Sequence, residues 1–455
     1  SEPLIMELIR GGYFQNDRIG ESKIKNVENI ISKYVFILKN NPEYKNGKMG
    51  LVFYNSLLEI ASCEIEETLS PSIKEMALID YMFETMLERI KVNDAIYERN
   101  LLGKEDKDIQ IYIAVQQALF KFDNPIISYN LLKYKYPYWN NPNEEEILKI
   151  SQNIHKIIGG VAKDIVNPMG QKFYAVCEKY DTPYLLLGDV LLKEDLEKIS
   201  EYIYEPSFLE ESIKSAYLKR FANLKKTIRR AAFYSTLSIF ITKILSLVIL
   251  EYLLAYLIFN EKLTMASIFG SLLVPTGLMA FLVSTIRPPS KKNLNLAVME
   301  AMKIVYEKER MEIYEIKAAR KRGLFARIAL SLFYLASAAT SFGLIYWVFK
   351  LFGFPQTSII INIIFIALIL FAGTALQKRS QELTIEEPYD GFWGFVSDIM
   401  LLPVAGLGRW LSGKWKRYNF ISAFFNALID MPFSAFVEFL EGWRYFIKEK
   451  KEDLR

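Results

Sequence analysis

Polar side chains follow one narrow stripe along residues 418–447, a segment that is otherwise covered by large apolar residues. The preceding segment, 391–411, has a thinner version of it, because Asp398 and Arg409 lie about three helical turns apart and so share a face. Buried acids among membrane helices commonly mark ion or proton pathways, and Arg409 could act as their counter-ion. The candidate residues of this polar stripe are Asp398, Arg409, Asn426, Asp430, Glu438 and Glu441.

The polar stripe has a second interpretation, in which it faces water or headgroups on helices that lie in the membrane interface. We favour this interpretation, because the firm membrane spans of the chain offer little polar lining for a path. Basic residues beside the apolar segments agree with it, since clustered cations bind anionic headgroups. The candidate headgroup contacts are Lys225, Lys226, Arg229, Arg230, Lys414, Lys416 and Arg417.

Residues able to perform catalysis or to hold a metal ion are sparse. The chain has a single histidine, His155, and its two cysteines, Cys63 and Cys177, form no CxxC pair. Residues 408–415 nearly match the phosphate-binding loop GxxxxGK[ST], but Trp415 stands where a Ser or Thr would hold magnesium. We therefore expect no catalytic, cofactor-binding or metal-binding residue and no cofactor, and the sequence indicates a non-enzymatic protein.

The apolar residues are concentrated in the second half of a chain of 455 residues that is 24% charged and has a formal net charge of +4. The runs at 231–286 and 325–377 each exceed the roughly 20 apolar residues of a membrane-spanning helix, and each predicts a hairpin of two such helices. Within the first run, Lys243 and Glu251 lie about 80° apart around an ideal α-helix and are poorly placed to pair. Each could instead extend to its nearer interface.

The distribution of charge predicts the orientation of these helices. The connections inside the two hairpins are short, whereas the segments on the other side carry the clustered cations, which places both termini in the cytoplasm. A hydropathy window would also count 391–411 and 418–447 as spans, but a crossing at 391–411 would leave Lys414 and its basic neighbours outside. The sequence therefore predicts four transmembrane helices followed by two interfacial or re-entrant helices, in a bacterial inner membrane.

The first 205 residues show helical periodicity nearly throughout, with prolines at the joints, and form a segment long enough to bury its own core. The fold class is therefore all-α: a helical cytoplasmic domain followed by a polytopic α-helical membrane domain. The predicted boundaries are 1–205 (helical domain), 206–230 (basic connecting helix), 231–286 (first hairpin), 287–324 (charged helix continuing into the third span), 325–377 (second hairpin), 378–390 (linker), 391–447 (two amphipathic helices) and 448–455 (charged tail).

A block near the end of the chain, made of residues 406–412, Asn419, 429–433 and 436–443, is similar to the C-terminal regions of a family of multi-pass bacterial membrane proteins. This resemblance brings no activity with it. The functional hypotheses therefore rest on the residues themselves.

Two functions are consistent with these features. The first is a non-enzymatic inner-membrane protein that anchors a helical interaction or scaffold domain, with anionic lipid and a protein partner or a second copy as its contacts. The alternative is an oligomeric channel or transporter with the polar stripe along its path. Nucleic acid is not an expected partner, because the aromatic residues of 134–139 lack a broad basic surface around them.

Overall fold

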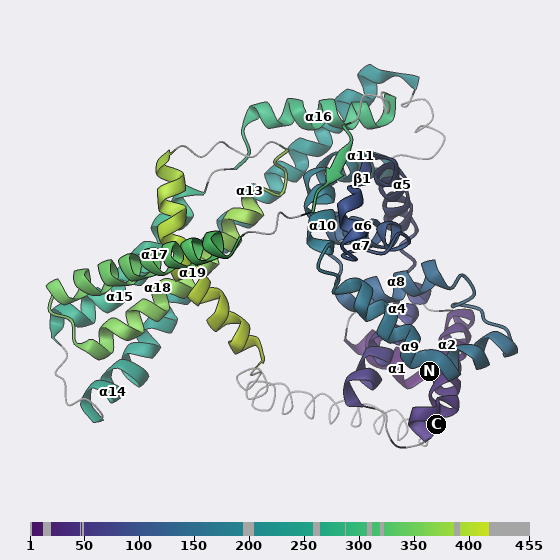
Figure 1. The fold of residues 1–455 in the computed structure, drawn as a ribbon, viewed down its shortest axis with the longest axis horizontal. Helices are drawn as coiled ribbons and strands as arrows, with labels where there is room; N and C mark the ends of the chain where they lie inside the picture. The colour runs from purple at the N-terminus through teal and green to yellow at the C-terminus, as the bar shows by residue number, and fades with distance from the viewer. Residues whose placement is uncertain are drawn as a thin grey trace, which may run out of the picture. The chain divides into compact units, whose positions relative to one another are not determined.

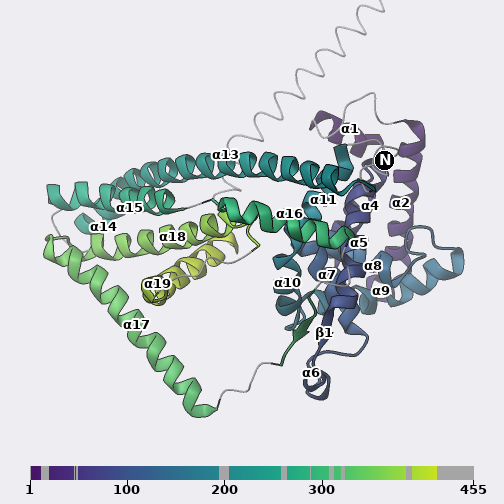
Figure 2. The same cartoon turned by 90° about the horizontal axis from the view of Figure 1, so that it is seen from above.

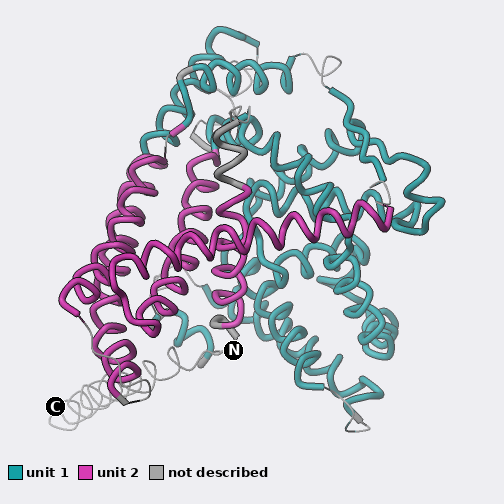
Figure 3. The backbone as a smooth tube through the Cα atoms, turned by 60° about the vertical axis from the view of Figure 1, so that its left-hand side comes forward, with its two compact units in different colours: residues 1–222, 289–321, 383–387 teal, residues 223–288, 322–382, 388–455 magenta. Residues whose placement is uncertain are grey.

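The computed structural model describes residues 2–11, 20–45, 47, 50–193, 204–257, 264–286, 288–306, 312–318, 323–385 and 392–417. Nearly all of this chain is helical (Figure 1), which confirms the all-α fold class. Two compact units divide the chain and are coloured separately in Figure 3. Unit 1 comprises residues 1–222, 289–321 and 383–387, and unit 2 comprises residues 223–288, 322–382 and 388–455.

Unit 1 consists of helices whose apolar faces meet in a shared core. Helix α2 shows the predicted periodicity, since Val27, Ile30 and Ile37 on one face are buried. Helix α7 is buried along most of its length and packs against α5 and α10. The helices of this unit before the membrane segment are α1 (Glu2–Arg10), α2 (Glu21–Asn40), α3 (Pro42–Lys45), α4 (Leu51–Leu69), α5 (Ile73–Arg89), α6 (Asp94–Glu98), α7 (Asp106–Phe120), α8 (Asn124–Lys135), α9 (Glu144–Ile165), α10 (Gly170–Lys179) and α11 (Asp181–Lys193).

Local sequence signals fix where several of these helices begin. At the start of α9, the Asn143 side chain accepts a hydrogen bond from the Glu146 amide, and the Glu146 carboxylate accepts one from the Asn143 amide, both at 2.8 Å. This capping box satisfies two backbone donors that the first turn would otherwise leave free. Asp123 caps α8 in the same manner, by accepting from the Ile126 amide at 3.2 Å.

A continuous charged helix over 293–321, expected from the sequence, is not what the structure shows. Helix α16 (Lys291–Tyr306) ends early, and strand β2 (Tyr314–Ile316) follows it and pairs in parallel with strand β1 (Ile90–Val92). The register joins Ile90 to Tyr314 and Val92 to Ile316. The loose helical period misled because a three-residue strand is stabilised by its distant partner and not by its own pattern.

Asn293, on α16, links residues 383–385 and Tyr217 within unit 1. Its side-chain amide donates to the Tyr217 hydroxyl at 3.0 Å and to the carbonyl of Leu383, and its side-chain oxygen accepts from the Ile385 amide at 2.8 Å. Only 5% of Asn293 is exposed. Unit 1 is therefore completed by residues that follow each of the two apolar hairpins in sequence.

Four helices in the described part of the chain are long and apolar enough to cross a membrane, as predicted, and they indicate a membrane protein. Three of their ends lie within a few residues of the predicted hairpin limits 286, 325 and 377. They are α13 (Pro206–Ser246), continued by the π-helix η2 (Leu247–Glu251) and α14 (Tyr252–Leu257); α15 (Met265–Thr285); α17 (Leu324–Leu351); and α18 (Gln356–Ser380).

Residues 206–230, predicted as a basic connecting helix, form the first part of α13 without interruption. Helices α17 and α18 meet in a tight turn at Gly353, whose φ of +72° favours glycine. Away from this turn α17 diverges from α18 toward Leu324 (Figure 2). Most of its large apolar side chains are exposed, as expected for a helix that faces lipid.

Helix α19 (Phe392–Arg417) packs against α17 and α18. Gly408 approaches Ala367 so closely that an added Cβ would lie 2.0 Å from the Ala367 carbonyl oxygen. The hydroxyls of Ser337 and Ser341, in the small-residue stretch of α17, donate to the α19 carbonyls of Ile399 and Met400 at 2.7 Å each. Ala367 lies near the middle of α18, so α19 contacts the apolar bundle at mid-length. The interfacial or re-entrant placement of α19 stays a prediction.

Candidate functional site

The predicted polar stripe is only partly described by the structure. Asp398 lies within α19, and Arg409 is exposed on the same helix. The remaining four candidates lie outside the described residues. They are Asn426, Asp430, Glu438 and Glu441. The stripe therefore stays a prediction as an ion path and as an interfacial surface.

The predicted headgroup contacts are exposed wherever their side chains are described. Lys225, Lys226, Arg229 and Arg230 project from α13 immediately before its apolar part, and Lys414 is exposed on α19. The two others, Lys416 and Arg417, belong to α19 with side chains outside the description. Their exposure is compatible with lipid binding, which stays a prediction.

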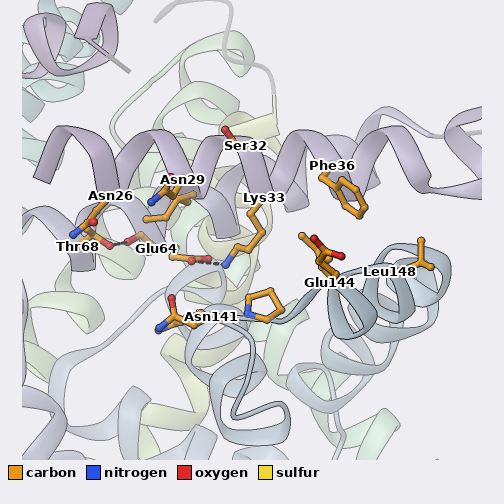
Figure 4. A pocket seen from close by; sticks show the side chains of 14 residues that line it. Asn26, Asn29, Ser32, Lys33, Phe36, Glu64, Thr68, Asn141, Glu144 and Leu148 are labelled. Atoms are coloured by element: carbon orange, nitrogen blue, oxygen red, sulfur yellow. Dashed lines mark hydrogen bonds and ion pairs between the residues drawn. The ribbon is translucent and has the colours of Figure 1, made fainter. Parts of the chain in front are cut away.

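A cavity of about 1150 Å³ in unit 1 is a candidate binding site. It lies between one face of α2, the end of α4, and the segment that leads into α9 (Figure 4). The residues that line it are Asn26, Asn29, Ile30, Ser32, Lys33, Phe36, Glu64, Thr68, Asn140, Asn141, Pro142, Glu144, Ile147 and Leu148.

A buried ion pair forms the floor of this cavity. The Lys33 ammonium points into the cavity toward the Glu64 carboxylate (Figure 4), and the two side chains are 8% and 3% exposed. Lys33 also donates to the Trp139 carbonyl at 2.9 Å, and the Tyr34 hydroxyl donates to the second Glu64 oxygen at 2.8 Å. Both charges are therefore satisfied by hydrogen bonds, as a buried pair requires.

Burial shifts the pKa values of Lys33 and Tyr34, the two hydrogen-bond donors to Glu64, in opposite directions. It lowers the pKa of Lys33, an effect that the negative charge of Glu64 opposes. It raises the pKa of Tyr34, and Glu64 adds to that rise. The floor is therefore neutral as a whole, with the tyrosine protonated and the lysine and glutamate charges cancelling each other.

Amides and hydroxyls form the walls of the cavity. The side chains of Asn26, Asn29, Ser32 and Asn141 are exposed and make no hydrogen bond with another described residue. In Figure 4 Asn26 and Asn29 lie at one end of the cavity, whereas Phe36, Leu148 and Glu144 lie at the other. Free carboxamides offer two donors and two acceptors each, so these walls can bind a neutral group that both donates and accepts.

The groups most often used in covalent and metal chemistry are not assembled at this cavity. Burial and nearby acids raise the pKa of the Cys63 thiol to about 12, so it stays protonated at neutral pH. His155 stacks on Phe53, with ring centroids 3.7 Å apart, and lies 2.8 Å from Glu43. Among the described residues, no group of three or more His, Cys, Asp or Glu residues could hold a metal ion. The described lining of the cavity therefore consists of amide, hydroxyl and apolar groups around the Lys33–Glu64 pair, with a second acid in Glu144.

This cavity is not predicted by any pattern in the sequence. Its one available signal was Lys33, which occupies the apolar face of α2 between the buried Ile30 and Ile37. A lysine in that position needs a buried partner, and the partner, Glu64, is on another helix. The asparagines gave no signal, because exposed amides are common on helices and in loops.

Comparisons with protein-family models, with curated proteins and with solved structures found no match to this chain. The fold therefore defines only a class: an all-α membrane protein with four helices long enough to span a bilayer and a helical unit that contains an amide-lined cavity.

Proposed function

We propose that this chain is a non-enzymatic protein of the bacterial inner membrane that presents its helical unit to a protein partner in the cytoplasm. In this proposal the partner inserts an extended peptide segment into the cavity above the Lys33–Glu64 pair. The unpaired carboxamides of the cavity walls are the observation that supports it.

The spacing of the lining residues on α2 suits an extended peptide. Asn26, Asn29, Lys33 and Phe36 share one face and span about 15 Å along the helix axis. An extended chain rises about 3.3 Å per residue, so four or five residues would cover this length. Each peptide bond carries one donor and one acceptor, and a carboxamide complements both.

Charge and apolar contacts define which peptide fits best. Lys33 and Glu64 cancel each other, so Glu144 leaves the lining with one net negative charge. Phe36 and Leu148 are 39% and 42% exposed at the same end of the cavity. We therefore expect a segment in which an apolar side chain is followed or preceded by Lys or Arg.

The orientation in this proposal rests on the exposed cations of α13. Lys225, Lys226, Arg229 and Arg230 adjoin the apolar part of the helix, and the positive-inside rule places such clusters in the cytoplasm. The helical unit precedes this cluster in the chain and would share its side of the membrane.

A peptide-binding experiment on the full chain in detergent tests the proposal. The immobilised protein is incubated with a positional-scanning hexapeptide library, and the preferred peptide is then titrated by fluorescence anisotropy. We expect retention of pools with an apolar residue beside a basic one. The Asn26→Ala, Asn29→Ala double variant should bind about tenfold more weakly, because each lost amide pair contributes about 0.5–1.5 kcal/mol.

The matched control is Asn153→Ala, an exposed amide of α9 that hydrogen-bonds to its own helix and does not line the cavity. It should bind the peptide as the unchanged protein does. Equal binding by the double variant, or retention of maltohexaose in place of any peptide pool, would show that the cavity is not a peptide site.

A further inference from the structure

Three basic side chains are buried in the described part of the chain: Lys33, Arg89 and Lys243. Lys33 pairs with Glu64 in unit 1. Lys243 pairs with Glu251 in the apolar bundle of unit 2. Arg89 is only 6% exposed and forms no ion pair with any described residue. It is therefore the one buried cation among these residues that no acid neutralises.

The ion pair in the bundle corrects a prediction from the sequence. The expectation that Lys243 and Glu251 are poorly placed to pair is wrong, since their side chains form a buried ion pair. The π-helix η2 accounts for the difference, because a π turn takes one residue more than an α turn. Eight residues then cover the rotation of about seven, which is about 20° short of two full turns, so the two side chains share a face.

Arg89 is the last residue of α5 and lies directly before strand β1. Its guanidinium group lies over the ring of Tyr180, 5.4 Å from the centroid, at the junction of α10 and α11. Tyr184 follows in the first turn of α11, and Tyr314 begins β2 opposite Ile90. We call Arg89, Tyr180, Tyr184 and Tyr314 the arginine–tyrosine cluster. All of its elements belong to unit 1.

Three buried donors of this cluster have no hydrogen-bond partner among the described residues. They are the Nε–H and Nη1–H groups of Arg89 and the hydroxyl of Tyr184, which is 0% exposed. Native proteins satisfy almost all buried donors, and a guanidinium group cannot lose its proton to avoid the cost of burial. The Tyr180 ring attracts the cation but carries no negative charge. The cluster therefore lacks an anionic acceptor.

The acids that act on this guanidinium are already engaged by other groups. Burial lowers the pKa of Arg89, and Glu300 and Glu312 oppose this effect less than two tyrosines of the cluster do. Glu300 forms an ion pair with Lys303 at 2.7 Å. Glu312 accepts hydrogen bonds from two tyrosine hydroxyls of the cluster, at 2.5 Å and 3.3 Å. Neither acid contacts the guanidinium, so its charge stays uncompensated.

The cluster is closest to water at β2. Tyr314 is half-buried there, whereas the other two rings of the cluster are at most 5% exposed. The ammonium of the exposed Lys179 lies 5.8 Å from the centroid of the Tyr314 ring. Lys179 and Glu312, both exposed, have opposite charges. Arg89 therefore leaves this part of unit 1 with one net positive charge.

We propose that the arginine–tyrosine cluster binds a small monocarboxylate. The carboxylate oxygens accept hydrogen bonds from the guanidinium N–H groups of Arg89 and from the hydroxyl of Tyr184. A guanidinium group holds its donors in a planar fork that matches the two oxygens of a carboxylate. The tyrosine rings contact the short apolar part of the ligand.

Charge and shape select this class of ligand. A monoanion cancels the charge of Arg89, whereas a dianion such as sulfate would leave one net negative charge in a buried site. Chloride has the right charge but offers a single atom to three unpaired donors. A carboxylate offers two oxygens, each with two lone pairs.

Equilibrium dialysis with radiolabelled propionate tests the proposal. The purified full chain in detergent is dialysed against ¹⁴C-propionate at pH 7 in sodium chloride of constant ionic strength. We expect saturable binding of about one propionate per chain, which excess acetate displaces and excess sulfate does not. No saturable binding by the unchanged protein would overturn the proposal. Displacement by sulfate as effective as displacement by acetate would overturn the assignment of a monocarboxylate.

Two variants locate the bound propionate. Arg89→Met keeps a long side chain but removes the charge, and it should abolish saturable binding. Tyr184→Phe removes only a hydroxyl and should weaken binding about threefold to tenfold, because it removes one hydrogen bond. Unchanged binding by Arg89→Met would contradict the proposal. If thermal unfolding shows that Arg89→Met does not fold, unchanged binding by Tyr184→Phe contradicts it instead.

A second arginine of unit 1 provides the matched control. The guanidinium of Arg220 pairs with the Asp189 carboxylate, with Nη2 donating at 3.0 Å. Arg220→Met should bind propionate as the unchanged protein does. A loss equal to that of Arg89→Met would show a general effect on unit 1 and overturn the assignment. No residue of the cluster lines the peptide cavity, so either proposal can fail without the other.

Discussion

Asp181 begins α11 in unit 1 with only 7% of the residue exposed. Burial raises the pKa of its carboxyl to about 7, although Lys121, at 3.9 Å, and a hydrogen bond from Thr182, at 3.1 Å, both oppose the rise. The ion pair with Lys121 does not offset the cost of burying the Asp181 charge, because the two charged atoms are 3.9 Å apart and the lysine side chain is exposed to water. Folding therefore favours the protonated acid.

The Asp181 carboxyl makes the folding stability of unit 1 depend on pH. The pKa is about 3.9 in an unfolded chain, so the stabilisation from Asp181 is fully present below about pH 4 and is lost as the pH rises through about 7. Asp181→Asn mimics the protonated form and should stabilise the protein at pH 8 by a few kcal/mol, with little effect at pH 4. Thermal unfolding at both pH values measures this.

The control for that prediction is Glu211→Gln, a change of an exposed acid on α13. Its stability should follow that of the unchanged protein at both pH values. An equal shift in the two variants, or a larger stabilisation by Asp181→Asn at pH 4 than at pH 8, would contradict the assigned cause.

The limits of several helices could be predicted from the sequence, whereas the contacts between distant segments could not. The end of α15, the beginning of α17 and the end of α18 lie within a few residues of the predicted hairpin limits, because apolar composition is a local property. Strand β2 could not be predicted, since its partner Ile90–Val92 is remote in sequence. Nor could the Lys243–Glu251 pair, because a π turn has no recognised pattern and the predicted geometry assumed a regular α-helix.

The same limit applies to the candidate cavity. Lys33 could be recognised as a lysine on an apolar face, but its partner Glu64 follows only from how α2 and α4 pack. The polar stripe was visible in sequence because its residues repeat along one segment. Residues that meet from different helices leave no such repeat.

The contact between α18 and α19 gives a prediction at the scale of these elements. A Cβ at Gly408 would lie 2.0 Å from the Ala367 carbonyl oxygen, whereas one at Gly413 on the same helix would meet no atom within 4 Å. Gly408→Ala should lower the free energy of unfolding by about 1–3 kcal/mol, because backbone must shift. Gly413→Ala should raise it by up to about 1 kcal/mol, because alanine favours the helix.

Chemical unfolding in detergent, followed by tryptophan fluorescence, measures both glycine variants. Opposite signs are expected for the two changes. Stabilisation by Gly408→Ala would show that α19 does not pack against α18 at this position.

The arrangement of the whole molecule across the membrane is proposed from charge and can be tested directly. In a background of Cys63→Ala and Cys177→Ala, single cysteines replace Thr264, before α15, and Lys414, on α19, both exposed. Intact cells should react with a membrane-impermeant thiol reagent at position 264 only, and permeabilised cells at both. Reaction at position 414 in intact cells would reverse the orientation or add a crossing.

Unit 1 has a consequence for how this protein is synthesised. Its chain is interrupted twice by apolar hairpins, and residues 289–321 and 383–387 return to it after each one. The ribosome must therefore translate both hairpins, and the insertion machinery must accept them, before β1 finds β2 and Asn293 finds residues 383–385. Until then the core of unit 1 is incomplete and part of its apolar surface is exposed. A chaperone or fast membrane insertion would protect that surface from aggregation.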